Sequence, residues 1–505
     1  MTRAILVPYD QLSLDRGAKR DAVPGRDEIL MVESERMLRS RTWHAQRIHL
    51  LLSAAAHHAQ ALRALGFTAH ERRAPSLGEG LASFRAERPG IEIVATEPRS
   101  RPLRTSLAAQ GVAFIEDDSF LTPRDQTIAR WNGRLPVMES FYREQRRRLN
   151  ILMDGDGPVG GQWNYDADNR LPPPKGAHPW PEPLRHEPDE IDDRVWQDIV
   201  ERRLPVTGHA PDGTWATTRA GALAQLDHFL STGLAGFGPY EDAMPTDTWA
   251  ANHSLLSTYL NCGLLDPDEV VSAAVARYDA GGIPLSSIEG FVRQVIGWRE
   301  YVNLVYWATD DAYAQAKGFA ADQPLPPAFE DPTLTEMACV RSVVGDVHAR
   351  GWTHHIPRLM VLANLCLLAG VQPAALLDWM RRMFVDAADW VMVPNVIGMG
   401  VHADGGRMMT KPYAAGGAYI NRMSRHCRDC PFDPKSRTGD SACPFTTLYW
   451  DYLMRHEASL RGNQRMALQV KNVARLKPED RTAIQARAAG IRANGGAPPR
   501  ALTLL

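Results

Sequence analysis

Long apolar runs are missing from this 505-residue sequence. The longest such run, LMVLANLCLLAG, has about a dozen residues, far short of the roughly 20 that a membrane-spanning helix needs. The N-terminal stretch MTRAILVPYDQLS also lacks the apolar segment and the small-residue cleavage site of a secretory signal. We therefore expect a cytoplasmic protein with no membrane span.

A strong excess of charge of one sign is also missing, and cysteines are few. The formal net charge of −2 argues against polyanion binding by the whole surface, although a local basic face could still bind DNA. Six cysteines in a cytoplasmic chain of this size are better explained by metal or redox chemistry than by disulfides. With 44% hydrophobic and 23% charged residues, the chain has a globular composition and is long enough for two or three domains.

The first part of the chain, residues 1–135, alternates between strand-like and helix-like patterns. A helical pattern covers Thr42 to Leu65, and apolar runs typical of strands cover Ala4 to Pro8, Ile29 to Glu33, Ile91 to Ala95 and Val112 to Ile115. This alternation predicts βαβ units and a parallel sheet. Ligands on such sheets lie at the carboxyl ends of the strands, which here points to Asp10 and Glu33, although Asp10 could equally be a turn or helix-cap residue.

Residues 136–190 are expected to form a connector. After a short basic helical start, this stretch is too rich in glycine and proline for a helix or a central strand. Its embedded Trp163, Asn164, Tyr165 and Arg170 indicate that it packs against the rest of the protein. The run Arg146 to Arg148 could face phosphates or could simply be a solvated helix face.

The remaining chain is predicted to be helical. Helix-period segments with short turns fill residues 191–475, and no strand alternation competes with them. The segment 476–505, rich in alanine and arginine and ending in GGAPPRALTLL, is expected to be a frayed tail.

A close cysteine cluster predicts a metal site. Three cysteines form a C-x2-C-x12-C pattern: Cys427, Cys430 and Cys443. Zinc sites and cubane iron–sulfur sites both take four ligands, so a fourth thiolate is needed. Cys262 and Cys366 lie in apolar runs typical of buried thiols, whereas Cys339 begins a helical pattern and is the expected fourth ligand. The spacing alone leaves zinc and iron–sulfur equally open.

Two other kinds of motif carry candidate chemistry. The segment HHIPR places His354, His355 and Arg358 at the start of an apolar helix, where the imidazoles could transfer protons near neutral pH or could merely cap and pack. The segments FGPYEDAM, HSLLSTYLNCGLL and FVRQVIGWREY bring together hydroxyls, helix starts and arginines, which suit a diphosphate.

Taken together, these motifs resemble one known family. FGPYEDAM, HSLLSTYLNCGLL, IGWREY, HHIPR, PNVIGM, TKPYAAGGAYINRMS and C-x2-C-x12-CPF are similar to the iron–sulfur branch of the photolyase and cryptochrome superfamily. That branch holds the prokaryotic (6-4) photolyases and related bacterial cryptochromes. The resemblance covers nearly the whole chain.

The resemblance implies an α/β, Rossmann-like antenna domain followed by a large all-α FAD-binding domain with a [4Fe-4S] cluster. The cluster ligands would be Cys339, Cys427, Cys430 and Cys443, and 6,7-dimethyl-8-ribityllumazine would lie near Asp10 and Glu33. The FAD-binding residues that it implies are Tyr240, His253, Ser254, Leu255, Leu256, Ser257, Glu289, Arg293, Trp298, Asp386, Asn395 and Met399.

The resemblance also implies light-dependent repair of (6-4) photoproducts in DNA by a monomeric enzyme, with the lesion flipped into a pocket over the flavin. His355 would be the acid, His354 and Arg358 would hold the lesion or the acid, and Tyr413 and Tyr419 would line the pocket. Two other functions stay open: a blue-light receptor with the same cofactors and no repair, and an iron–sulfur protein that only binds nucleic acid.

The sequence departs from the family pattern at a few positions. Met392 stands where many relatives carry glutamate close to the flavin, and Tyr9 stands in the antenna strand where glycine is common. Trp379 and Trp390 are the candidate electron relays, and Met380 follows where relatives place another aromatic residue.

Overall fold

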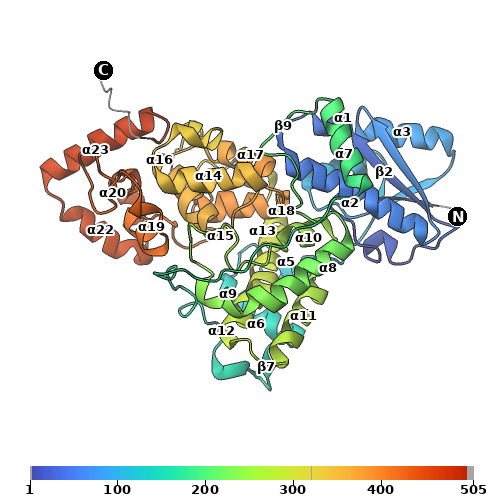
Figure 1. The fold of residues 1–505 in the computed structure, drawn as a ribbon, viewed down its shortest axis with the longest axis horizontal. Helices are drawn as coiled ribbons and strands as arrows, with labels where there is room; N and C mark the ends of the chain where they lie inside the picture. Colours follow the sequence, from blue (N-terminus) through green and yellow to red (C-terminus); the bar gives the residue numbers. More distant parts are fainter. Residues whose placement is uncertain (1–2, 320, 498–505) are drawn as a thin grey trace.

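The computed structural model describes residues 3–319 and 321–497. A five-stranded parallel sheet lies at one end of the molecule, and the C-terminal helices lie at the opposite end (Figure 1). The strands occur in the order β4-β2-β1-β5-β6, with bounds β1 Arg3–Leu6, β2 Glu28–Ser34, β4 Thr68–Ala74, β5 Glu92–Thr96 and β6 Ala113–Ile115. The predicted parallel sheet is therefore confirmed, and all four predicted strands are present within a few residues of their expected bounds.

Strand β4 was not predicted, because its sequence TAHERRA lacks apolar alternation. It lies at the sheet edge, paired only with β2, and most of its side chains are exposed or half-buried. Edge strands tolerate and often need such charged side chains, which discourage pairing with other chains.

Alternate residues of the sheet face opposite layers. Ile5 and Ile29 pack with helix α2 (Ala45–Ala64), whereas Leu6 and Leu30 pack with the layer formed by α3 (Leu77–Glu87) and α4 (Arg101–Ala109). Because strand side chains alternate between the two faces, both faces of a parallel sheet can be buried under helices.

His44 is the N-cap residue of helix α2, and its imidazole uses both nitrogens. Nδ1 accepts from the backbone N–H of Gln46, and Nε2 lies 3.0 Å from the carbonyl oxygen of His348. Because Nδ1 accepts, the proton must be on Nε2, so the ring is neutral. Burial is the main reason that the pKa of His44 falls to about 4.

The rest of the chain is almost entirely helical, as expected. Among the described residues of the helical part, β9 (Val206–Thr207) departs from this pattern and pairs with β3 (Trp43–His44). The main helices are α7 Glu190–Glu201, α8 Arg219–His228, α9 Leu234–Tyr240, α10 Ser257–Cys262, α11 Pro267–Asp279, α12 Leu285–Val292, α13 Glu300–Ala308, α14 Ala338–Arg350, α15 His355–Pro357, α16 Asn364–Ala369, α17 Pro373–Met383, α18 Asp389–Val393, α19 Gly417–Met423, α20 Pro444–Arg455, α22 Ala467–Ala474 and α23 Pro478–Ala493.

Four π-helical turns interrupt these helices within the described residues. They are η3 (Phe229–Gly233), η4 (Arg293–Arg299), η8 (Arg358–Ala363) and η9 (Pro394–Gly400). Such turns are rare and occur often at functional sites. Three of them contain residues predicted to bind a cofactor or lesion.

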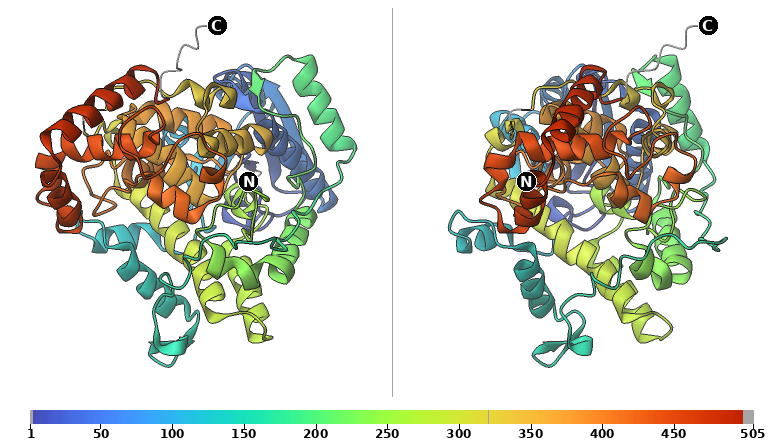
Figure 2. Two further views of the ribbon diagram at one scale, coloured as in Figure 1. Left: turned by 60° about the vertical axis from the view of Figure 1, so that its left-hand side comes forward. Right: turned by 90° about the vertical axis from the view of Figure 1, so that its left-hand side faces the viewer.

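The connector begins with α6 (Met138–Leu149), which projects with the hairpin β7–β8 (Met153–Asp154 and Gly157–Pro158) at the lower edge in Figure 1 and is seen from the side in Figure 2. Arg146 at its end is fully buried and donates to the carbonyl oxygens of Ile151, Leu152 and Trp163. This arginine neither faces phosphate nor is solvated, because it satisfies the carbonyls of the chain that leaves the helix.

The C-terminal segment is not frayed over its described part, contrary to expectation. Helix α23 packs on α20 and buries Ile484, Ala488 and Ile491. The apolar spacing of these residues was obscured by the surrounding arginines and alanines. Residues 498–505 lie outside the described part.

Within residues 3–319 and 321–497, no helix combines the length and the apolar character that crossing a bilayer requires.

Candidate functional site

The predicted histidines lie together at the start of α15. His354 precedes the helix as its N-cap residue, and its ring stacks on that of His253 with the centroids 4.2 Å apart and the planes at 24°. His253 comes from the loop before α10, about a hundred residues earlier in the chain. Folding therefore joins the HHIPR motif to the HSLLST motif.

These imidazoles are neutral and incompletely hydrogen-bonded. His253 Nε2 and His354 Nδ1 are buried atoms with no hydrogen-bond partner. Burial is the main cause that lowers the pKa of His253 to about 3 and that of His354 well below its ordinary value; cationic neighbours add to it. Unsatisfied buried nitrogens are costly, so this position suits a polar ligand group.

His355 differs from His354 in its exposure. Its side chain is accessible to solvent, although protein surrounds it densely enough to lower its pKa, with Arg358 as a further cause. An accessible imidazole in dense surroundings can reach a bound molecule.

Asp386 accepts hydrogen bonds from several residues beside the histidines. Its carboxylate accepts two hydrogen bonds from Arg358, both of 3.0 Å, and one of 2.7 Å from the hydroxyl of Ser257. Its backbone carbonyl accepts from Asn261. Three predicted site residues, from positions up to 129 apart in the sequence, thus form one network.

The backbone just before α10 is strained. Leu255 has φ of +58° and is buried, and its neighbour Leu256 is buried as well. A left-handed conformation is unfavourable for a branched, non-glycine residue and tends to occur at ligand sites. The hydroxyl of Ser254 accepts from the N–H of Leu256 and so stabilises this turn.

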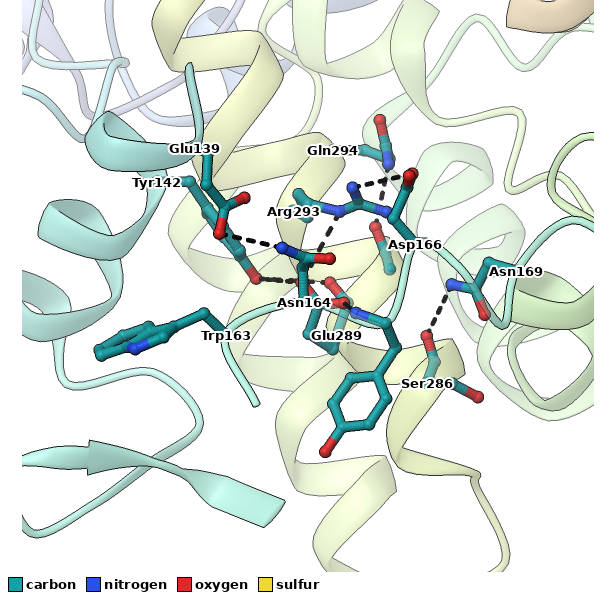
Figure 3. Close-up of polar contacts among 12 residues, drawn as sticks. Glu139, Tyr142, Trp163, Asn164, Asp166, Asn169, Ser286, Glu289, Arg293 and Gln294 are labelled. Carbon is teal, nitrogen blue, oxygen red and sulfur yellow. Dashed lines mark hydrogen bonds and ion pairs between the residues drawn. The ribbon is translucent and has the colours of Figure 1, made fainter. Parts of the chain in front are cut away.

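Glu289 and Arg293 form part of a second network, which holds the connector (Figure 3). The Glu289 carboxylate accepts from the hydroxyl of Tyr142 at 2.8 Å and from the backbone N–H of Tyr165 at 2.9 Å. Arg293 donates to Asp166 at 3.1 Å and lies 3.7 Å from Glu289. Both residues were predicted to bind FAD, but in this structure their contacts fasten residues 164–169 to α12 and η4.

The remaining predicted flavin residues are spread over several elements. Tyr240 ends α9 and packs against Trp180 of the connector with the ring centroids 5.3 Å apart. Asn395 in η9 donates to the carbonyl of Val391, and Met399 is buried in the helical core. Trp298 of η4 is half-buried.

Tyr413 and Tyr419 are half-buried and share charged neighbours. Burial is the main cause that raises the pKa of both phenols, and Asp242 and Arg170 act on both. Both tyrosines are therefore protonated at neutral pH and able to donate hydrogen bonds.

The two relay candidates and Met392 are buried. Trp379 donates its indole N–H to the carbonyl of Phe329, whereas Trp390 Nε1 has no partner. Met392 is buried in α18.

The four predicted cysteines line a single pocket. They come from the first turn of α14, from η10 and its following loop, and from the residue before α20: Cys339, Cys427, Cys430 and Cys443. Burial is the main cause that raises the pKa of Cys339, and its next causes are the other three thiols of this group. Cys262 and Cys366 lie buried elsewhere in the core, as expected for thiols without a metal.

The spacing of these sulfurs bears on the type of metal. Four thiolates on one zinc, with Zn–S bonds of ~2.3 Å, lie about 3.8 Å apart. Among the described residues, no three of these sulfurs come within 4.8 Å of one another. The sulfurs of this pocket are thus farther apart than the four thiolates around a single zinc ion.

The two predicted antenna residues have different surroundings. Glu33 at the end of β2 is engaged in ion pairs with Arg73 at 3.0 Å and Arg202 at 2.7 Å. Asp10 lies beyond β1, where burial raises the pKa of its carboxyl, and its neighbour Gln11 has a buried Oε1 with no partner. The Asp10 side thus offers a buried side-chain oxygen without a partner.

Sequence reasoning overlooked Glu241 and Asn261. Burial raises the pKa of Glu241 to about 8, so it is largely protonated at neutral pH, and it accepts from Gln294 at 2.6 Å. Its position in the FGPYEDAM motif, directly after the predicted site residue Tyr240, was the available signal.

Comparisons with known proteins agree with this architecture. The family model described as deoxyribodipyrimidine photo-lyase-related protein matches residues 5–215. A protein named (6-4) photolyase from Agrobacterium fabrum is 39% identical over 509 residues, covering 97% of this chain and 99% of the relative. A shorter uncharacterised protein, R855 of Acanthamoeba polyphaga mimivirus, is 28% identical over 24% of this chain and 90% of its own length.

A solved structure shares the fold. The crystal structure of a bacterial class III photolyase from Agrobacterium tumefaciens superimposes with a TM-score of 0.53 at 15% identity, covering 98% of this chain and 97% of that one. The chain therefore belongs to the photolyase and cryptochrome superfamily, in the bacterial branch that includes the Agrobacterium (6-4) photolyase.

Proposed function

We propose that this protein repairs pyrimidine (6-4) pyrimidone photoproducts in DNA in a light-dependent reaction. The observation that carries the proposal is the group formed by His354, His355 and Arg358, an accessible imidazole beside a fixed guanidinium. The 39% identity to a protein named (6-4) photolyase supports the same substrate.

The residues fit a flavin between the histidine stack and α10. The unpartnered nitrogens of His253 and His354 and the strained turn at Leu255 are what a ligand with several polar groups would satisfy. FAD would be held there by His253, Ser254, Ser257 and Asp386. When bound and excited by light, it would supply the electron that splits the lesion.

The thiol pocket fits a [4Fe-4S] cluster rather than zinc, and its ligands would be Cys339, Cys427, Cys430 and Cys443. The support is the spacing of the sulfurs and the apolar lining given by residues such as Met337 and Phe432. Iron–sulfur clusters are held by four thiolates.

The protein's own part in repair would be to position the lesion and move a proton. The two hydrogen bonds to Asp386 fix the position of the Arg358 guanidinium, so this group would hold His355 or a phosphate in place. His355 is mainly neutral in the free protein, because its pKa is lowered. The negative charge of bound DNA would raise that pKa, so the imidazole would become the acid only in the complex.

We also infer that residues 1–135 form an antenna domain and residues 191–475 the catalytic domain. A lumazine would bind on the Asp10 side of the strand ends, where the side-chain oxygen Oε1 of Gln11 has no hydrogen-bond partner. Glu33 is a poor candidate for the same site, because two arginines already neutralise it.

The experiment is a repair assay on two defined oligonucleotides, one with a (6-4) lesion and one with a cyclobutane dimer, each in light and in darkness. We expect light-dependent loss of the (6-4) lesion alone. Repair of only the cyclobutane dimer, or no light-dependent repair by protein that contains flavin, would contradict the proposal.

A further inference from the structure

A histidine and two carboxylates meet where helix α2 of the sheet domain packs against helix α7. His57 lies on α2, Asp189 is the N-cap residue of α7, and Asp192 lies in its first turn. The Nε2 atom of His57 is 3.5 Å from Asp189 Oδ1 and 3.6 Å from Asp192 Oδ1. One ligand atom from each residue lies within 4.8 Å of the other two.

The two buried members of this group lack hydrogen-bond partners. The side chain of His57 is 9% exposed and that of Asp192 is 8% exposed, and neither His57 Nε2 nor Asp192 Oδ1 makes a hydrogen bond. Buried polar atoms are nearly always paired, and leaving two of them unpaired and facing each other is costly. The orientation of these two atoms indicates that both could bind one ligand placed between them.

The start of α7 holds the two carboxylates in place. Asp189 Oδ1 accepts from the N–H groups of Ile191 and Asp192, while Asp192 Oδ2 accepts from the N–H of Asp189. This reciprocal capping arrangement fixes both side chains. It uses only one oxygen of Asp192 and leaves Oδ1 directed at His57.

The distances match those between ligands of one metal ion. Nitrogen and oxygen ligands ~2.0–2.2 Å from a tetrahedral zinc lie about 3.3–3.6 Å apart. A direct hydrogen bond between His57 and a carboxylate would instead bring the atoms to about 2.7–3.2 Å. The measured 3.5 and 3.6 Å agree with the first arrangement.

The ligand types narrow the choice of metal. Imidazole nitrogen is a ligand of zinc and related first-row ions, whereas magnesium and calcium prefer oxygen alone. The two carboxylates balance the charge of a divalent ion. Asp189 is 56% exposed, so water can complete the coordination.

We propose that His57, Asp189 and Asp192 bind one zinc ion, which joins the sheet domain to the first helix of the helical domain. The site is separate from the four cysteines, and it does not depend on the proposed repair function. Zinc binding here would stabilise the contact between α2 and α7, because a ligand that binds only the folded state stabilises that state.

The test uses the full-length protein with its iron and flavin contents measured in the same sample. It is incubated with one equivalent of zinc and passed through a desalting column, and metals are then quantified by mass spectrometry. Three variants are compared with the wild type: His57→Gln, Asp192→Asn and, as a matched control, His209→Gln, which changes an exposed histidine outside this group. Asp192→Asn leaves the N-cap residue Asp189 unchanged, and the side-chain oxygen of asparagine can still accept from the N–H of Asp189.

We expect the wild type and His209→Gln to retain one zinc per chain at unchanged iron content. His57→Gln and Asp192→Asn should bind zinc at least ~10-fold more weakly, since loss even of a group behind a ligand costs that much. Zinc should also raise the unfolding temperature of the wild type and not that of His57→Gln. Equal zinc retention by His57→Gln, or none by the wild type with full iron, would overturn the proposal.

Discussion

The ion pair between Arg358 and Asp386 makes a strong prediction about stability and activity. The Asp386 carboxylate is 6% exposed and receives two hydrogen bonds from Arg358, whose side chain is 18% exposed. The substitution Asp386→Asn preserves the shape of the side chain and can still accept from Ser257. What it removes is the negative charge, so the guanidinium is left without its counterion.

The magnitude follows from burial. Removing one partner of a buried ion pair costs about 3–5 kcal/mol, and the partial exposure of Arg358 places this case at the low end, about 3 kcal/mol. The helical domain has roughly 300 residues, and its unfolding entropy is about 2.1 cal/mol/K per residue. A loss of about 3 kcal/mol therefore corresponds to a fall of about 5 °C in the unfolding temperature. Because Arg358 is then free to move, light-dependent repair should fall by up to ~100-fold.

The assay is thermal unfolding followed by circular dichroism, with repair of a (6-4) oligonucleotide measured on the same preparations. Asp378→Asn is the matched control, because Asp378 also pairs with arginine but is 49% exposed, and exposed pairs contribute ~0–1 kcal/mol. A double-mutant cycle with Arg358→Met should give a coupling of about 2 kcal/mol. If Asp386→Asn unfolds at the same temperature as Asp378→Asn, or if the two substitutions are simply additive, the reasoning is refuted.

Three further predictions concern the metal, the acid and the pH dependence. Cys430→Ser should lose iron, as measured by iron analysis, and should give a lower yield of folded protein. Cys366→Ser should keep the iron content and the yield of the wild type. Full iron in Cys430→Ser would remove Cys430 from the ligand set. His355→Ala should keep flavin and iron but lose (6-4) repair, and unchanged turnover would exclude His355 as the acid. The folded-state pKa of His44, about 4, lies below its unfolded value of ~6.5. Its contribution to the free energy of unfolding is therefore present above pH 6.5 and is lost as the pH falls towards 4, by up to ~3 kcal/mol. His44→Asn should flatten the fall in unfolding temperature between pH 6.5 and 4.5, and an equal fall in both proteins would contradict this.

Much of the local structure could be predicted from the sequence. The strands near Ile5 and Ile29 are short apolar runs between turn residues, and the helix after Trp43 shows clear periodicity, so their type follows from neighbouring residues alone. Strand β4 and helix α23 escaped prediction because their charged residues hide the pattern, and only packing against β2 and α20 reveals their buried sides.

The candidate site also has features that the sequence predicted and features that it did not. The C-x2-C-x12-C spacing and the HHIPR motif are local, and they sufficed to predict a metal site and a histidine site. The stack of His253 on His354 and the neutralisation of Glu33 by Arg202 were not visible in the sequence, because each pair is far apart along the chain.

The sequence by itself determined the type of most segments, the candidate site residues and the family that the motifs resemble. Only the tertiary structure decided that Ser257 meets Asp386 and that His57 meets the start of α7. The physical reason is that backbone conformation and apolar periodicity depend on residues a few positions apart. Contacts over a hundred positions depend instead on how all the buried surfaces pack together.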